Sequence, residues 1–420
     1  MTKYTEYGTF DLKLSILTIN DIINANGGNS MNIRNLYDQS ESWMIELRRW
    51  FHRHPELSLQ EKETSGKIQE ELTKLGIPYQ VLAPNYGIVA TIQGSRPGKK
   101  IVLRADIDAL PVTEETGLSF ASEHPGVMHA CGHDAHAAML LGAARILQEN
   151  KDELCGTVIC LFQVAEETGF GYKEALDHFD SIGGVDGVIG LHIWSAVPEG
   201  EIVLLPGSIF AGGKGYDLKV KGQGGHGGRP DLVNDPIKTA CEMVLKFASI
   251  PTNFYDVLDH SVVNVGKIEA GTIGNVFPSE ANIYGGFRWY KTGGDELILE
   301  KMHQIAKGVC QIYGTDYELI VRGGVPPVVN QADMIARARE LVADVPGLNV
   351  SPQTEPICAG DNFGYILQKY PGFYGVLGAG KKGETIYPQH HCKFDVDESA
   401  LRKGSEFMTR FAIDFLNGGK

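Results

Sequence analysis

The segment from His129 to His136 holds the densest group of side chains able to do chemistry. Within it, Cys131 and His133 stand two residues apart, and Asp134 follows directly. Thiolate, imidazole and carboxylate groups are ligands of borderline metals such as Zn²⁺. Without a metal, the same segment would be a helix start with Asp134 near the positive end of the helix dipole. The segment alone leaves both interpretations open.

Two further groups follow short apolar runs that are typical of buried strands. Glu166 and Glu167 come just after the run 157–162, and His192 closes the run 188–191. Adjacent buried carboxylates repel each other unless a cation compensates them, and a metal can bind one and leave the other as a base. Open α/β sheets bind ligands outside the carboxyl ends of their strands. Together the three groups favour a metal site over solvated loops.

Two other histidine-bearing segments are less specific. Of the adjacent pair His390 and His391, one could complete the metal site while the other is structural. His226 lies in the glycine-rich segment 224–229, which by itself is more typical of an exposed turn.

The elements that would position these groups alternate between strands and helices. The apolar runs 101–105, 157–162 and 187–191 predict buried strands. Between the first two, residues 135–150 place their leucines on one face of a helix. This alternation predicts an α/β domain with a mostly parallel sheet.

After residue 211 the pattern changes to half-solvated strands and amphipathic helices. The predicted order is strand, helix, strand, strand, helix, strand, which is that of a ferredoxin-like unit. The expected elements are residues 216–220, 236–247, 261–268, 282–289, 295–313 and 317–322. The sequence therefore predicts an inserted lid or dimerisation domain at 211–324, a catalytic domain at 31–210 and 325–420, and an N-terminal extension at 1–30.

Composition excludes several classes of protein. The 420 residues include 38 Lys and Arg against 52 Asp and Glu, a net charge of −14, which argues against broad nucleic-acid or anionic-membrane binding. The seven cysteines form no disulfide framework, and no run approaches the roughly 18 apolar residues of a membrane span. We expect a cytoplasmic protein. Neither a GxSxG nor an HExxH motif is present.

Taken together, these residues resemble the N-acyl-amino-acid amidohydrolase family, which includes hippurate hydrolase and indole-3-acetyl-amino-acid hydrolases. That family belongs to the aminoacylase and carboxypeptidase G group of dinuclear metallopeptidases. The resemblance extends from about Trp43 to Phe415. The matching segments are 49–58 (RWFHRHPELS), 104–111 (RADIDALP), 128–136 (MHACGHDAH), 162–167 (FQVAEE), 190–192 (GLH), 224–226 (GGH) with 235–236 (DP), and 394–398 (FDVDE).

The resemblance implies a site for two divalent metal ions. Mn²⁺ and Zn²⁺ suit the donor set best, with Co²⁺ or Ni²⁺ as alternatives. His390 is preferred to His391 because it stands at the first position of the family's His-x-Pro-x-Phe pattern. The implied metal ligands are Cys131, His133, Glu167, His192 and His390.

The resemblance also implies roles for residues around the metals. Glu166 matches the general base, which takes a proton from a metal-activated water and delivers it to the leaving amine. His226 matches a histidine that reaches across a dimer to stabilise the oxyanion. Asn275 and Arg288 match residues that bind the substrate carboxylate, and Asp108 is expected to orient a ligand histidine from behind.

The implied function is hydrolysis of the amide bond of N-acyl amino acids by a homodimer or higher homo-oligomer built through the inserted domain. Phe170 and Tyr172, close to Glu166, point to an aromatic acyl group or side chain in the substrate. A dipeptidase or carboxypeptidase using the same site is the alternative enzyme. A non-catalytic binding protein is a third reading, but it would be expected to have lost a ligand or the base.

Overall fold

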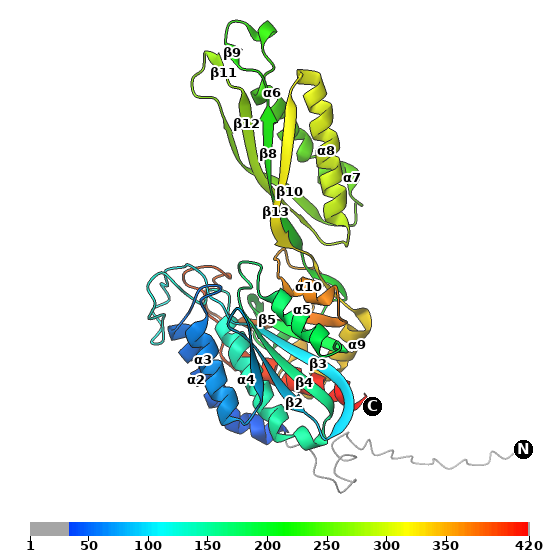
Figure 1. Cartoon of the computed structure of the whole chain (residues 1–420). Helices are drawn as coiled ribbons and strands as arrows, with labels where there is room; N and C mark the ends of the chain where they lie inside the picture. The colour runs from blue at the N-terminus through cyan, green and yellow to red at the C-terminus, as the bar shows by residue number, and fades with distance from the viewer. Residues whose placement is uncertain (1–32, 419–420) are drawn as a thin grey trace, which may run out of the picture.

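The computed structural model describes residues 33–418. The extension predicted for residues 1–30 lies outside the described residues, as do 31, 32, 419 and 420. The described chain forms a larger unit and a smaller, elongated unit that stands on it (Figure 1). No helix within 33–418 has both the length and the apolar character needed to cross a bilayer.

An eight-stranded mixed sheet forms the centre of the larger unit, in the order β1-β2-β4-β3-β5-β16-β6-β15. Its four central strands, β4, β3, β5 and β16, are parallel, as the continuous apolar runs predict. Strands β1 and β2 are antiparallel because a short turn joins them. The strands are β1 (Tyr79–Leu82), β2 (Gly87–Gln93), β3 (Arg96–Asp106), β4 (Cys155–Gln163), β5 (Gly187–Pro198), β6 (Glu201–Val203), β15 (Asn349–Val350) and β16 (Gly372–Gly380).

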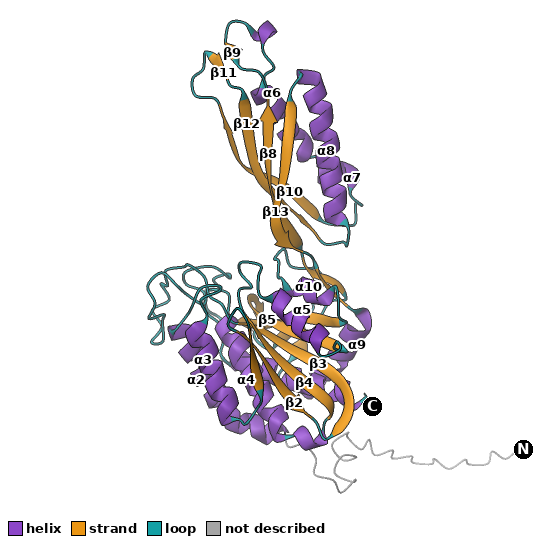
Figure 2. Cartoon of the chain, viewed as in Figure 1, coloured by secondary structure: helices purple, strands orange, loops and turns teal. Residues whose placement is uncertain are grey.

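Helices cover both faces of this sheet (Figure 2). On one face, apolar side chains of five helices pack on the sheet in a single large core, and two short helices cover the other face. The first layer consists of α2 (Ile33–Arg53), α3 (Lys62–Lys74), α4 (His133–Glu149), α9 (Ala332–Leu341) and α11 (Ser399–Asn417), and the second of α5 (Tyr172–Ser181) and α10 (Phe363–Leu367). The predicted α/β fold is confirmed.

The smaller unit is a four-stranded antiparallel sheet, in the order β10-β12-β8-β13, with its own apolar core. Helix α6 begins at Pro236, as predicted, where the Asp235 side chain accepts from the main-chain N–H of Ile237. The elements are β8 (Gly212–Lys221), α6 (Pro236–Phe247), α7 (Ile250–Phe254), β10 (Ser261–Ala270), β12 (Glu280–Trp289), α8 (Gly294–Tyr313) and β13 (Asp316–Val325).

Small elements complete the described chain. Strands β9 (Gly225–His226) and β11 (Val276–Phe277) pair at the tip of the smaller unit, far from the larger one (Figure 1). Strands β7 (Gly207–Phe210) and β14 (Val328–Asn330) pair where the chain passes between the units. The 3-10 turns are η1 (Lys151–Glu153), η2 (Pro230–Leu232) and η3 (Val342–Asp344).

Candidate metal centre

The chemically active side chains gather at the carboxyl ends of the parallel strands. Asp108 follows β3, and Glu166 and Glu167 follow β4. Cys131 and His133 sit at the amino end of α4. His192 does not close its strand as expected, because β5 leaves β3 after Gly190 and continues beside β16 to Pro198.

The five predicted metal ligands lie together. Cys131 Sγ is 3.5 Å from His192 Nε2, and Glu167 Oε1 is 3.9 Å from His133 Nε2 and 3.5 Å from His390 Nε2. They form two groups that share Cys131, one with His133 and His192 and the other with Glu167 and His390. Within each group the donor atoms lie within 4.8 Å of one another, which is the spacing of ligands around an ion.

The side chains present fit divalent metals. His133 Nε2 and Glu167 Oε1 are buried and have no hydrogen-bond partner among residues 33–418. The Nδ1 atoms of His133 and His192 donate to the main-chain oxygens of Asp108 and Ile193, so each Nε2 offers its lone pair to the centre. Buried polar atoms without partners are rare unless a ligand completes them.

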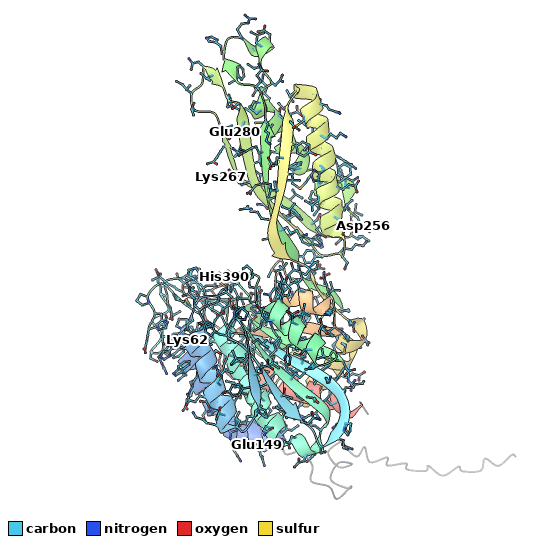
Figure 3. The ribbon with its side chains drawn as sticks, viewed as in Figure 1. Lys62, Glu149, Asp256, Lys267, Glu280 and His390 are labelled. Carbon is cyan, nitrogen blue, oxygen red and sulfur yellow. The ribbon has the colours of Figure 1, made fainter. Side chains whose placement is uncertain are left out.

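The backbone takes unusual conformations where it presents these groups. Gly132 has a φ of +91°, and a Cβ there would lie 2.4 Å from Ile193 Cγ2, so only glycine fits between Cys131 and His133. His390 has a φ of +68°, and its N–H donates to the Ala130 oxygen at 2.7 Å. His390 lies on the side of the larger unit that faces the smaller one (Figure 3), and its Nε2 is 3.5 Å from Glu167 Oε1, whereas His391 stacks on Tyr387.

Asp108 is buried behind the centre and holds two parts of it. Its Oδ1 accepts from the Glu166 N–H at 3.1 Å and lies 3.3 Å from His133 Nδ1. Its Oδ2 accepts from the Glu167 N–H at 3.1 Å and from Ser58 Oγ at 2.6 Å. Burial by itself would raise the pKa of Asp108, but the contacts with His133 and Ser58 lower it, so the carboxyl stays ionised.

Glu166 is partly buried beside the ligands. One carboxylate oxygen, Oε1, accepts from the main-chain N–H of Asn362 at 3.1 Å. Burial, followed by repulsion from Asp361 and Glu167, raises the pKa of Glu166 well above its ordinary range. Burial also raises the pKa of Glu167 to about 7. Bound cations would favour the ionised forms of both groups.

This geometry agrees with comparisons to known proteins. Residues 102–414 match the sequence model of peptidase family M20/M25/M40. The chain belongs to this family. Over 390 residues, it is 36% identical to thermostable carboxypeptidase 1 of Saccharolobus solfataricus, covering 92% of this chain and 98% of the relative. The predicted family resemblance is confirmed, and the protein is a hydrolase of amide bonds.

Relatives from Bacillus subtilis extend the comparison. The chain is 34% identical to N-acetylcysteine deacetylase, with 88% of this chain and 96% of the relative covered. The crystal structure of a dinuclear metal binding peptidase of the M20 family superposes with a TM-score of 0.80 at 32% identity, covering 90% of this chain and 99% of that chain. The clustered donor side chains of this M20 chain thus lie in a fold that it shares with a relative that binds two metal ions.

Sequence reasoning missed a buried pair beside the ligands of this M20 enzyme. Asp106, at the end of β3, accepts from His136 Nδ1 at 2.5 Å, and His136 Nε2 accepts from the Ile193 N–H at 2.8 Å. Ile193 in turn accepts from His192, so Asp106 and His136 position that ligand. The signal was present in the sequence, because His136 is one helical turn after His133.

Asp134 does not join the metal ligands. It is buried and pairs with Arg48 Nε at 2.9 Å and with His52 Nδ1 at 2.8 Å. Its contacts therefore tie the start of α4 to α2, which makes it structural rather than a ligand.

The structure separates the three residues that were expected to contact the substrate. Arg288 on β12 lines a cavity of about 560 Å³ between the two units, together with Glu166 and Glu167. His226 and Asn275 lie at the opposite end of the smaller unit, where the Gly227 N–H donates to the Asn275 oxygen at 2.8 Å. Within one M20 chain they do not reach the centre (Figure 1).

Proposed function

We propose that this protein cleaves N-acyl amino acids into a carboxylate and a free amino acid. The observation that carries the proposal is the cavity that brings Glu166 and Glu167 together with Arg288. Among the described residues no carboxylate pairs with Arg288, whose Nη1 donates to the Phe287 oxygen at 3.1 Å. A guanidinium is suited to bind the carboxylate of the amino acid in bidentate fashion.

Glu166 is proposed as the general base and then the general acid. Its Oε1 is held by the Asn362 N–H, so Oε2 is the atom that accepts a proton from the attacking water and passes it to the leaving amine. When bound, two divalent ions would polarise the amide carbonyl and acidify water.

The ions would be held by Cys131, His133, Glu167, His192 and His390. Mn²⁺ and Zn²⁺ suit a set of one thiolate, three imidazoles and one carboxylate, and Co²⁺ or Ni²⁺ could replace them. All seven cysteines are free, which supports the cytoplasm as the compartment.

We propose that residues 31–210 and 325–420 form the catalytic domain and residues 211–324 form a lid and dimerisation domain. His226 and Asn275 then act in the site of a second copy of the chain, His226 on the oxyanion and Asn275 on the substrate carboxylate. Their exposed position at the tip of the smaller unit supports this arrangement. A homodimer, or a larger assembly of dimers, follows from it.

The test is release of free amino acid from acetyl, benzoyl and indoleacetyl amino acids, before and after chelation and with Mn²⁺ or Zn²⁺ restored. We expect metal-dependent release. Glu166→Gln should bind metal normally but lose about three orders of magnitude in turnover, the scale of a lost acid–base group with water activation. Near-normal turnover by this variant would remove Glu166 from the mechanism.

A carboxypeptidase or dipeptidase reaction on the same site is the second candidate. The identity with thermostable carboxypeptidase 1 favours it. The two activities differ in the group before the scissile amide, an acyl group in one and an aminoacyl group in the other. Competition between a dipeptide and an N-acyl amino acid with the same carboxyl-terminal residue distinguishes them by the ratio of kcat/KM values.

A further inference from the structure

Three aromatic side chains line the cavity that also contains Glu166 and Arg288. They are Phe170, Tyr172 and Tyr365. The rings of Tyr172 and Tyr365 stack with their centroids 4.2 Å apart and their planes 8° from parallel. Phe170 keeps 55% of its surface exposed. The cavity therefore has an apolar, aromatic wall beside the proposed base.

The backbone holds Phe170 in place although its ring is free. Its N–H donates to the Ala165 oxygen at 2.9 Å, and its own oxygen accepts from Asn362 Nδ2 at 2.8 Å. Gly171 follows with a φ of +78°, and a Cβ there would lie 2.0 Å from the Val164 oxygen. The loop thus allows little freedom, and an exposed ring on a fixed backbone is typical of a binding surface.

The same backbone contacts connect this ring to the catalytic group. Asn362 contacts both residues, because its main-chain N–H binds Glu166 and its side chain binds the oxygen of Phe170. A group resting on Phe170 is therefore positioned relative to the proposed base.

We propose that Phe170, Tyr172 and Tyr365 form an aromatic shelf that binds an aromatic side chain on the amino-acid half of the substrate. The inference rests on the proposed function, in which Arg288 binds the substrate carboxylate. Carboxylate and side chain leave the same α-carbon, so a cavity that binds one must accommodate the other. Stacked and edge-on aromatic contacts add affinity beyond area burial.

The proposal assigns a substrate class: N-acyl derivatives of phenylalanine, tyrosine and tryptophan. The test compares kcat/KM for N-acetylphenylalanine and N-acetylalanine. N-benzoylalanine serves as a third substrate, because its aromatic ring is in the acyl half. We expect the wild type to prefer N-acetylphenylalanine to N-acetylalanine by at least about tenfold. Phe170→Ala and Tyr172→Leu should each reduce that ratio by about tenfold or a little less, the scale of one lost aromatic contact.

Phe254→Ala is the matched control. Phe254 lies on α7, is 44% exposed and does not line this cavity, so its loss should leave the ratio unchanged. Bound metal and the thermal unfolding midpoint report whether each variant is folded. Because the Phe170 ring is exposed, its removal should leave the fold intact.

Three results would overturn the inference. The first is equal kcat/KM for N-acetylphenylalanine and N-acetylalanine in the wild type. The second is a ratio of these two values that stays unchanged in both Phe170→Ala and Tyr172→Leu. The third is a selective loss of N-benzoylalanine hydrolysis in these variants, which would show that the shelf binds the acyl half of the substrate. All three leave the proposed function standing. Hydrolysis of none of these amides by the metal-loaded wild type would overturn the proposed function and the shelf with it.

Discussion

Replacing Asp108 by Asn tests whether one buried carboxylate holds the metal centre together. Each of its oxygens faces two donors: Oδ1 faces the Glu166 N–H and His133 Nδ1, and Oδ2 faces the Glu167 N–H and Ser58 Oγ. In either orientation, an asparagine amide presents its NH₂ to two of these donors. At least one hydrogen bond to a charged acceptor is then lost, that of the Glu166 N–H or of the Glu167 N–H, because Ser58 Oγ can accept from the amide instead and the His133 Nδ1 proton also has the Asp108 main-chain oxygen.

A hydrogen bond to a charged group contributes about 1.5–3 kcal/mol, so the loss is at least about 1.5–3 kcal/mol. Part of it is recovered because no carboxylate has to be buried, and we expect a net loss of about 1–2 kcal/mol in the free energy of unfolding. Because the bonds hold Glu167 and His133, metal affinity should fall by about 10- to 100-fold, as for other residues that orient ligands.

Two measurements follow. Metal affinity is obtained by competition with a chromogenic chelator, and stability by urea unfolding of the metal-free protein. Ser58→Ala is the control, since it removes one donor but keeps the charge of Asp108 and its contacts with Glu166, Glu167 and His133. It should cost about 1–2 kcal/mol and change metal affinity little. An Asp108→Asn protein that binds metal as tightly as the wild type would refute the reasoning.

Three further predictions concern other groups. Burial raises the pKa of Glu61 to about 7, so stability should fall as pH rises from about 4.5 to 7. Glu61→Gln should remove only the share of this slope that Glu61 contributes, a relative gain of about 3 kcal/mol at pH 8 in urea unfolding with chelator, because Glu166 and Glu167 add their own shares. His136→Leu leaves Asp106 Oδ1 buried without its hydrogen-bond partner while Oδ2 keeps its ion pair with Arg104, and should cost about 1–3 kcal/mol in urea unfolding, whereas His136→Gln should cost less. His226→Ala and Glu166→Gln chains, each inactive alone, should regain about a quarter of wild-type turnover when unfolded and refolded together; no recovery would contradict a role across the dimer.

Part of the proposed ligand set is suggested by the strand ends of the sequence, whereas the complete set of five follows only from the family resemblance. Glu167 follows an apolar run, and the crevice at the carboxyl ends of parallel strands brings such positions together. Helix α6 was predicted to its first residue, since Asp235 and Pro236 are local signals. Both predictions depend on information within a few neighbouring residues.

Other features depend on contacts between distant segments. The helical spacing places His136 on the same face of α4 as His133, but its pairing with Asp106 joins α4 to β3, and the sequence does not show that contact. The sequence favours His390 over His391 only through the family pattern, and the left-handed turn that places His390 beside Glu167, with its N–H donating to the Ala130 oxygen, is not visible in the residue types. The strand β5 extends to Pro198 because β16, almost 180 residues later, pairs with it.

The order of the ligands along the chain decides when the metal centre can be completed during synthesis. Cys131, Glu167 and His192 leave the ribosome before the smaller unit, but His390 follows it. Translation proceeds at about 5–20 residues per second, so His390 is synthesised some tens of seconds after His192. During that time the edge of β5 is not yet paired with β16. The smaller unit has its own core with which to fold in that interval. The full set of proposed ligands thus exists only in a chain that has been translated beyond residue 390, so a product terminated before that residue would lack the complete centre.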